Sequence, residues 1–423
     1  MLNLNLSNST TNLDSSGFKE RIEKIKNTPV PKFAKYEPDL SKLKKLREKY
    51  KGRKNIIVEG NGGAISNFRG IWSALGEVSG KNIYLLDTED PDYIYELRKK
   101  CAKKNTLVIL TSKSGARIQV LANYFAFQDY PMLIITEDND GALNQIRKAK
   151  NLDVSFYPTV NMTDRYTGLT ESALTTAEIV GIDTEEMIAG GKAMYKKCNW
   201  KLETGNNPAL QLAITLAKLE KAGYTEIFLS IYSKKLSGFI ELIIQLYHES
   251  VCKNGIGQLI YGSEAPENQH HTLQRLISGR KNSIGFFITV KNPSHKENTP
   301  QRRSLSSEDC GEKARRDLKF EVEESLKNIK CRNIVLGNLN GVSLAEIFSA
   351  EFQGTWQDVV DNKIPAINLE LEEISPRSIG EFMAFFYYTT FYSALLRGVN
   401  PCDQPGVEKS KENIFEIVGR IKR

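Results

Sequence analysis

Three polar residues stand four positions apart in a predicted helix: Gln245, Glu249 and Lys253. On a helix such residues lie along one stripe, so a carboxylate able to act as a general base would have an amide and an ammonium group beside it. The same glutamate–lysine spacing is common in solvated ion pairs on helix surfaces. Taken alone, the pattern favours the solvated pair.

A turn of small and polar residues, 111–117 (TSKSGAR), follows the apolar run Leu107–Leu110. The hydroxyls of Ser112 and Ser114 and the free N–H groups at a helix N-terminus would form an anion site, to which Arg117 adds a phosphate-binding guanidinium. An ordinary N-cap at Ser112 explains the turn about equally well.

A second turn, 60–63 (GNGG), looks like the start of a dinucleotide-binding fingerprint, and Asp87 at the end of the next predicted strand strengthens that likeness. The third glycine of the fingerprint is missing, because Ile65 stands in its place. A tight strand-to-helix turn is the simpler interpretation, and close approach of the backbone to a sugar is a third.

Two later segments also gather polar groups. Residues 268–274 (NQHHTLQ) contain adjacent histidines, His270 and His271, which point in different directions on a helix or a strand, so at most one is expected to serve a given site. Residues 398–411 contain two prolines around Asp403 and Gln404, which predicts a rigid turn that holds polar groups at fixed offsets.

The composition narrows the class of protein. The 423 residues carry a net charge of +7, which is mild and suits an anionic small substrate. The 6 cysteines and 4 histidines form no C-x-x-C or H-E-x-x-H pattern, so we expect no metal, no disulfide framework and a reducing compartment. No apolar run is long enough for a membrane span.

The basic run 42–53 is read as a solvated helix rather than a nucleic-acid-binding arm, because Leu43, Leu46 and Tyr50 recur at helical spacing.

Short apolar runs alternate with helical periods from residue 55 onward, which predicts an α/β fold of two successive halves, each a parallel sheet flanked by helices. The predicted strands are Asn55–Glu59, Asn82–Asp87, Thr106–Thr111, Pro131–Thr136 and Val154–Tyr157 in the first half, and Thr225–Tyr232, Gly257–Tyr261, Ser283–Val290, Asn333–Leu336 and Ala366–Leu369 in the second. A long helical stretch, about 168–200, separates the halves. The polar stretch 291–330 is predicted to be an excursion that ends in a charged helix.

Four regions follow from this pattern. Residues 1–20, rich in Asn, Ser and Thr, are expected to be a disordered polar tail. Residues 21–200 and 201–400 are the two α/β domains, and 401–423 is a C-terminal segment. The last long helix of the second domain should start at Ser375-Pro376 and bury the stripe Ile379, Phe382, Met383 and Phe386.

Taken together, these motifs resemble the glucose-6-phosphate isomerase family, with the elements in the family's order over about residues 55–416. Ser112-Lys113-Ser114-Gly115 resembles its phosphate loop, Asp164-Arg165-Tyr166-Thr167 the element with its active-site arginine, Glu249-Ser250 with Lys253 the element with its catalytic base, and Gln269-His270 with Gln274 the element with its catalytic histidine. The segment 400–411 (NPCDQPGVEKSK) resembles the C-terminal signature, with Gln404 and Lys411 at the matching places.

The resemblance implies two sugar-isomerase domains with the active site between them, completed by the C-terminal segment. It implies a cytoplasmic, cofactor-free and metal-free isomerase that acts on a phosphosugar through an enediol. It also implies a homodimer whose partner contributes the histidine, and no nucleic-acid or membrane partner. The implied catalytic residues are Glu249, His270, Lys411 and Arg165, and the implied substrate-binding residues are Ser112, Lys113, Ser114, Arg117, Gly63, Gln245 and Gln404.

Several positions depart from the family's pattern. Ala64 stands where a serine is usual, Arg117 where a threonine is usual, and Asp164 where a glycine is usual. A carboxylate at 164 could repel a phosphosugar or pair with an arginine. Two rival functions stay open at this point: a broader isomerase that also accepts mannose 6-phosphate, and a sugar-phosphate-binding regulatory protein without turnover. Retention of Glu249, His270, Arg165 and Lys411 together argues against the second, since a pure binder needs no base.

Overall fold

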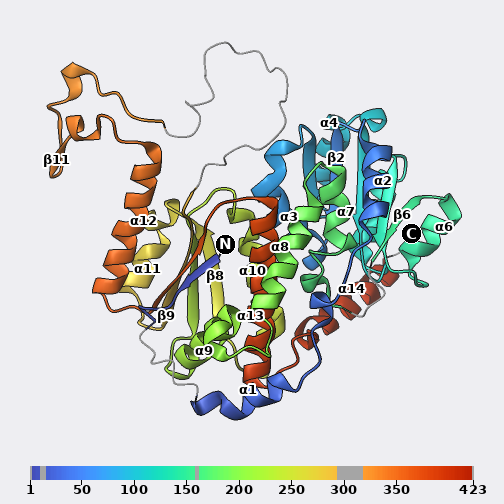
Figure 1. The fold of residues 1–423 in the computed structure, drawn as a ribbon. Coiled ribbons are helices and arrows are strands. Elements are labelled where there is room, and N and C mark those ends of the chain that lie inside the picture. The colour runs from blue at the N-terminus through green and yellow to red at the C-terminus, as the bar shows by residue number, and fades with distance from the viewer. Residues whose placement is uncertain (1, 10–15, 158–161, 293–317, 422–423) are drawn as a thin grey trace.

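The computed structural model describes residues 2–9, 16–157, 162–292 and 318–421. Two five-stranded sheets lie on either side of a central layer of helices (Figure 1). This is the α/β arrangement that the alternation of apolar runs and helical periods predicts.

The first sheet has the strand order β3-β2-β4-β5-β6, and all its strands are parallel. Its strands are β2 (Asn55–Gly60), β3 (Asn82–Leu86), β4 (Thr106–Thr111), β5 (Met132–Thr136) and β6 (Asp153–Phe156). The helices that alternate with them are α3 (Gly63–Leu75), α4 (Pro91–Lys100), α5 (Ile118–Phe127) and α6 (Ala142–Lys150). All five strands predicted for the first half are confirmed, because strands buried on both faces are continuous apolar runs.

The second sheet has the order β1-β12-β9-β7-β8. Its parallel strands are β7 (Glu226–Ile231), β8 (Leu259–Glu264), β9 (Ser283–Val290) and β12 (Ala366–Leu371). The accompanying helices are α9 (Pro208–Lys221), α10 (Ile240–Val251), α11 (Thr272–Ser278), α12 (Leu344–Asp361) and α13 (Pro376–Arg397).

The fifth strand of this sheet, β1 (Leu2–Asn5), corrects the prediction of a disordered tail. It pairs antiparallel with β12, with Leu2 opposite Leu371. Leu2, Leu4 and Leu6 alternate with polar residues and pack on the core, a period-2 pattern typical of an edge strand. Further along, α1 (Lys19–Lys26) buries Ile22 and Ile25, so the tail prediction is wrong for residues 2–9 and 16–20.

The polar stretch 291–330 also differs from prediction. Residues 293–317 lie outside the described chain, and the one helical element among residues 318–330 is a short 3₁₀ turn at Glu324–Leu326, in place of the predicted charged helix. The strand predicted at Asn333–Leu336 is reduced to β11 (Ile334–Val335), which forms a separate hairpin with β10 (Lys330–Cys331). This hairpin lies at the end of α12, away from the second sheet (Figure 1).

The helical stretch predicted at 168–200 is two helices, α7 (Glu171–Ile179) and α8 (Thr184–Lys197), separated by Gly181 at φ 92°. Two glycines bring α8 and α13 together backbone to backbone. A Cβ on Gly190 would lie 1.9 Å from the carbonyl oxygen of Arg377, and one on Gly380 would lie 1.9 Å from that of Met187. One hydrophobic core therefore runs from the inner face of the first sheet through these helices to the inner face of the second.

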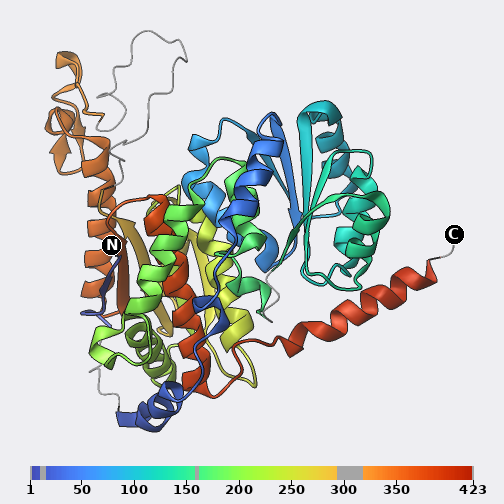
Figure 2. The same cartoon turned by 45° about the vertical axis from the view of Figure 1, so that its right-hand side comes forward.

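Helix α13 begins where predicted, with Ser375 as N-cap and Pro376 as its first residue. The whole predicted stripe is buried, and so is almost every other side of the helix, because α8, α9, α10 and the second sheet pack around it. The basic run lies mostly in α2 (Leu40–Tyr50), which buries Leu43 and Tyr50 as expected. The last helix, α14 (Glu408–Arg420), leaves the body of the molecule and buries none of its side chains (Figure 2). Among the described helices, none combines the length and the apolar character that crossing a membrane requires.

Candidate active site

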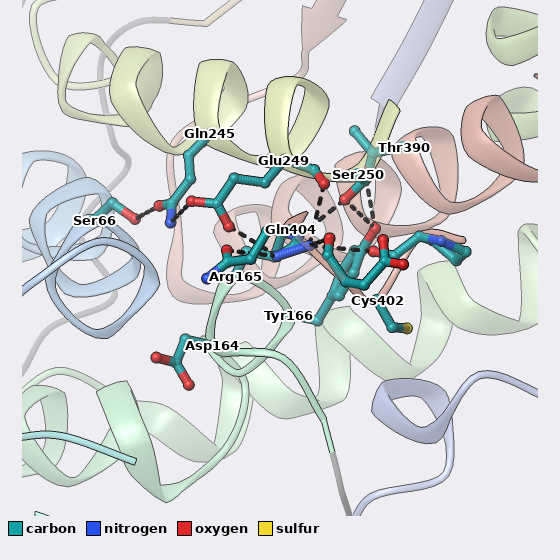
Figure 3. Close-up of polar contacts among 12 residues, drawn as sticks. Ser66, Asp164, Arg165, Tyr166, Gln245, Glu249, Ser250, Thr390, Cys402 and Gln404 are labelled. Atoms are coloured by element: carbon teal, nitrogen blue, oxygen red, sulfur yellow. Dashed lines mark hydrogen bonds and ion pairs between the residues drawn. The ribbon is translucent and has the colours of Figure 1, made fainter. Parts of the chain in front are cut away.

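The guanidinium of Arg165 lies at the centre of a polar cluster that joins three parts of the chain (Figure 3). Its Nε donates to Ser250 Oγ at 3.0 Å, Nη1 donates to Glu249 Oε2 at 2.8 Å, and Nη2 donates to the carbonyl oxygen of Asp403 at 2.8 Å. The Arg165 side chain is 2% exposed, whereas that of Glu249 is 28% exposed. A buried, fully oriented cation thus holds a carboxylate that a ligand can reach.

Helix α10 places Glu249 and Gln245 one turn apart. Gln245 Nε2 donates to Glu249 Oε1 at 2.8 Å, and Ser66 Oγ on α3 donates to Gln245 Oε1 at 2.8 Å. Both oxygens of the carboxylate therefore accept a hydrogen bond, one from an amide and one from a guanidinium. The alternative of a solvated Glu249–Lys253 pair is not what forms, because Lys253 lies beyond the end of α10 and pairs with Asp403 at 2.5 Å.

The C-terminal segment closes over this cluster. Lys253, 8% exposed, also donates to the carbonyl oxygen of Asn400, and so fixes the turn that precedes Gln404. With the Gln404 amide nitrogen facing Glu249, it donates to Oε2 at 2.5 Å while its oxygen accepts from Lys411 Nζ at 3.1 Å. Lys411, in the first turn of α14, also pairs with Glu408 at 2.7 Å. Three of the four predicted catalytic side chains, Arg165, Glu249 and Lys411, are thus linked in one chain of contacts.

Ser250 is itself supported by a buried phenol. Tyr166 Oη lies 2.8 Å from Ser250 Oγ and 3.4 Å from Thr390 Oγ1. Burial raises the pKa of Tyr166 to about 12, so the hydroxyl stays neutral over the ordinary pH range. The hydrogen bond that aims the Arg165 Nε is consequently insensitive to pH.

A pocket of about 380 Å³ opens beside Glu249. It is lined by Asn61, Gly62, Ile65, Ser66, Arg69, Asp87, Glu241, Gln245 and Glu249. Arg69 bridges two of its carboxylates, pairing with Glu241 at 3.0 Å and with Asp87. Such a lining of carboxylates, amides and one hydroxyl offers many acceptors and donors to a ligand rich in hydroxyl groups.

The turn at 112–117 lies next to this pocket and shares Asn61 with it through a contact from Arg117. Ser112 is buried and accepts a hydrogen bond from the backbone N–H of Gly115, but the N-cap residue of α5 is Arg117, so the interpretation of Ser112 as a helix N-cap is wrong. Ser114 is exposed, and α5 begins with no side-chain cap on its first N–H groups. Lys113 Nζ donates to the carbonyl oxygen of Met162 at 2.6 Å and lies 3.7 Å from Glu137. The exposed hydroxyl and the uncapped helix end keep an anion site available here.

Arg117 is directed toward protein acceptors. Its Nη1 donates to the carbonyl oxygen of Asn61 at 2.9 Å and its Nη2 to Asp164 Oδ2 at 2.8 Å. The Asp164 carboxylate points away from the Arg165 cluster (Figure 3). The arginine that pairs with Asp164 is therefore Arg117 and not the adjacent Arg165.

The turn before Arg165 is packed against the first turn of α3. A Cβ on Gly63 would lie 2.4 Å from the backbone carbon of Asp164, so only glycine fits this contact. The buried amide of Asn67 donates to the carbonyl oxygens of Gly63 at 2.6 Å and Asp164 at 3.2 Å, and it accepts from Tyr387 Oη at 2.7 Å. The close backbone approach expected at Gly63 is thus made by the protein itself.

His270 stands apart from this cluster. It lies in the short 3₁₀ helix Glu267–His270 after β8, the edge strand of the second sheet, and its side chain is exposed. It is not among the residues that line the pocket, and it forms no hydrogen bond or ion pair within the described chain. The adjacent His271 Nδ1 lies 2.5 Å from Thr272 Oγ1.

One buried carboxyl lies near the site without serving it. Glu59, at the end of β2, is fully buried, and neither of its oxygens has a hydrogen-bond partner among the described residues. Burial raises the pKa of Glu59 to about 8. Glu249 and Glu59 therefore lie in opposite surroundings: Glu249 is paired and lines the pocket, whereas Glu59 is unpaired, enclosed and not part of the pocket lining.

Some pocket residues were not predicted as site residues. Ser66 and Arg69 lie on the pocket side of α3, three residues apart, and Glu241 precedes Gln245 and Glu249 by one and two helical turns. Helical spacing from Gln245 would have indicated Glu241. Nothing in the local sequence indicated that Asp87 would turn toward α10. In the described part of the chain, no group of three or more His, Cys, Asp or Glu side chains could hold a metal ion.

No family model matches the chain. It is 26% identical over 393 residues to a probable glucose-6-phosphate isomerase of Methanococcus maripaludis, covering 90% of this chain and 82% of that one. It is 24% identical over 413 residues to the glucose-6-phosphate isomerase of Methanocaldococcus jannaschii, covering 96% and 93%.

The fold has close neighbours among solved structures. A hypothetical protein of Thermus thermophilus aligns with a TM-score of 0.84 at 20% identity, covering 99% of this chain and 100% of that one. A glucose-6-phosphate isomerase of Chlamydia trachomatis aligns with a TM-score of 0.76 at 17% identity, covering 99% and 88%. Both likenesses run through the two sheets and the helices between them, and the sequence likenesses to named isomerases extend over nearly the same length. The chain is thus similar, over nearly its whole length, to proteins named glucose-6-phosphate isomerase.

Proposed function

We propose that this protein interconverts glucose 6-phosphate and fructose 6-phosphate by proton transfer through an enediol. The observation that carries the proposal is the position of Glu249: a partly exposed carboxylate at the wall of a polar pocket, held from one side by Gln245 and from the other by Arg165. Relatives over nearly the whole length of the chain are named for this reaction.

Glu249 would act as the base that removes the proton from C2 of the open-chain sugar and returns it to C1. One carboxylate can serve both steps, since the two carbons of a planar enediol can lie on the same side of it. Arg165, already 2.8 Å from Glu249, would stabilise the negative charge that develops on the enediolate oxygen. Both groups are oriented before the substrate arrives, so the reaction requires little rearrangement of the protein.

The substrate phosphate would lie at the 112–117 turn, on the Ser114 hydroxyl and the uncapped N–H groups at the start of α5. The sugar would extend from there past Asn61 into the pocket. Gln245 and Gln404, which flank Glu249, would orient its hydroxyl groups.

Lys411 and His270 would move protons during ring opening. The contact of Lys411 with Gln404 supports its role, whereas the His270 side chain is exposed next to the edge strand of the second sheet and contacts none of these groups by a hydrogen bond or ion pair. We therefore propose a homodimer in the cytoplasm, in which His270 of one subunit completes the site of the other. An exposed histidine whose side chain forms no hydrogen bond or ion pair with the described residues of its own chain is consistent with such sharing.

Mixing two inactive variants tests the shared site. If Glu249→Gln lies in one subunit and His270→Ala in the other, a mixed dimer contains one site free of both changes. About half of the dimers in an equal mixture are mixed, so the mixture should regain about a quarter of the wild-type activity. Without shared sites, the mixture would remain as inactive as its components. Sedimentation of the wild-type protein at the assay concentration supplies the oligomeric state.

A coupled assay with fructose 6-phosphate tests the reaction itself, with mannose 6-phosphate assayed beside it for substrate range. Turnover of fructose 6-phosphate that Glu249→Gln abolishes would support the proposal. Phosphosugar binding without turnover by the wild-type protein would instead support the regulatory alternative.

A further inference from the structure

The ion pair between Arg117 and Asp164 lies at the border between the 112–117 turn and the turn that carries Arg165. Arg117 Nη2 donates to Asp164 Oδ2 at 2.8 Å, and Nη1 reaches the carbonyl oxygen of Asn61 at 2.9 Å. The two side chains are 30% and 12% exposed. A pair this enclosed is only weakly screened by solvent, so removing one charge leaves the other uncompensated.

The backbone that carries the Asp164 carboxylate is fixed from two sides. Gly63 packs against the carbonyl group of Asp164 so closely that no side chain would fit between them. The Asp164 carbonyl oxygen also accepts from Asn67 Nδ2 at 3.2 Å and from Thr167 Oγ1 at 2.7 Å. Within the described chain, Arg117 is the only group that forms an ion pair with the Asp164 carboxylate. Asp164 therefore remains beside the phosphate turn whether or not it has a counter-ion.

A fixed carboxylate at this place would repel a phosphate dianion at the 112–117 turn. Arg117 removes that repulsion, and its two terminal nitrogens are already directed at Asp164 and Asn61. Two roles for Arg117 can thus be separated: direct binding of the phosphate, or neutralisation of a neighbouring carboxylate.

We propose that Arg117 and Asp164 act as one charge-compensated unit, and that Arg117 promotes phosphosugar binding by neutralising the Asp164 carboxylate rather than by contacting the phosphate. Asp164 is then the residue that makes Arg117 necessary, and the two positions determine phosphate affinity jointly. This inference rests on the proposed function, because it takes the phosphate group of a phosphosugar as the ligand of the turn.

The two roles predict opposite results for a double variant. The experiment compares Arg117→Gln, Asp164→Asn and the double variant with the wild type, measuring the KM for fructose 6-phosphate and, by calorimetry, the Kd for inorganic phosphate. For neutralisation, Arg117→Gln raises both constants about 10- to 100-fold, Asp164→Asn leaves them unchanged or lowers them, and the double variant returns to within about threefold of the wild type. If Arg117 bound the phosphate directly, the double variant would stay as weak as Arg117→Gln.

Equal affinities in all four proteins would also overturn the proposal, since no coupling would exist. Thermal unfolding of each variant separates loss of binding from loss of folding, and Asp164→Gly provides a second neutral replacement if Asp164→Asn unfolds. The phosphate titration does not depend on turnover. If the wild type proved inactive as an isomerase, the affinities for phosphate alone would still decide between the two roles.

Discussion

The guanidinium of Arg165 and the carboxylate of Glu249 lie 2.8 Å apart, although the two residues come from opposite halves of the chain. The arginine is buried and the glutamate is partly exposed. This contact joins the two halves at the pocket, so that the proposed general base is positioned by a residue from the other half. Changes on either side should therefore affect turnover through the same geometry.

Replacing Glu249 with glutamine should lower kcat by about 10²–10⁴, the usual contribution of a general base, while KM changes little. The amide keeps the shape of the side chain and its contact with Gln245 but cannot accept the C2 proton. Steady-state kinetics with fructose 6-phosphate measure both constants. Glu77→Gln, an exposed glutamate that pairs with Lys235, is the matched control and should leave them unchanged. Near-normal turnover of the Glu249 variant would reject the assignment of the base.

Replacing Arg165 with lysine keeps the charge but loses the planar set of donors. An ammonium group cannot reach Ser250, Glu249 and the Asp403 carbonyl oxygen together. We expect kcat to fall about 100-fold and the free energy of unfolding to fall by about 2–4 kcal/mol, because buried acceptors lose their partners.

Urea unfolding and steady-state kinetics measure these effects. Arg377→Lys is the control, since Arg377 and Glu186 are each about half exposed and their pair should contribute little to stability. A wild-type kcat in the Arg165→Lys variant would show that catalysis does not require the planar set of donors on the guanidinium group.

Adding a methyl group at Gly63 should displace the Arg165 turn. The new Cβ would lie 2.4 Å from the Asp164 backbone carbon and 2.5 Å from the Arg165 nitrogen. Relieving this overlap requires a shift of the backbone at Gly63 or at Arg165, and either shift would change the site. Gly63→Ala should therefore destabilise the protein by about 1–3 kcal/mol and lower kcat together with stability. Gly52→Ala, where a Cβ meets no atom within 4 Å, should do neither. Equal thermal stability of the two variants would refute the close contact.

The buried carboxyl of Glu59 should make stability depend on pH. Its folded pKa of about 8 exceeds the ordinary value of 4.5, so the folded state binds more protons between these two pH values. Its contribution to stability is then complete below pH 4.5 and is lost as the pH rises through 8. Glu59→Gln removes the titrating group. The melting temperature of this variant, relative to that of the wild type, should therefore increase as the pH rises from about 5 to about 8. A difference that is constant over this range would contradict the prediction.

The sequence predicted the parallel strands well because their signal is local. Each buried strand, such as Thr106–Thr111, is a continuous apolar run between turn residues, and β2 to β6 appear where that pattern predicts them. The prediction that Asn333–Leu336 forms a strand of the second sheet was wrong. A short apolar run does not indicate whether the edge of a sheet lies close enough for pairing. The tail prediction failed for a related reason: the alternating leucines of β1 find their partner strand at the far end of the sequence.

The site was predictable where function depends on residue type, and less so where it depends on contacts between distant elements. The Gln245–Glu249 spacing and the C-terminal segment identified the groups around Arg165. No local pattern indicated that Asp164 would pair with Arg117, 47 positions earlier. Nor did any pattern indicate that Asn67, itself bonded to Tyr387, would hold the turn before Arg165 by a hydrogen bond. Such contacts arise from how the two sheet units pack, which the linear spacing of residues does not contain. Whether His270 joins the site remains a prediction for the mixed-dimer experiment.

The pairing of β1 with β12 has a consequence for how the chain acquires its native form. Among the described strands, β1 precedes all the others in the chain, yet it cannot pair until β12 has been made, because Leu371 is synthesised long after Leu2. Until then the leucines of β1 have no partner strand, and pairing between residues so distant in sequence is slow to form. Pairing of β1 with β12 completes one edge of the second sheet. A probe attached to β1 would therefore detect a late step of folding.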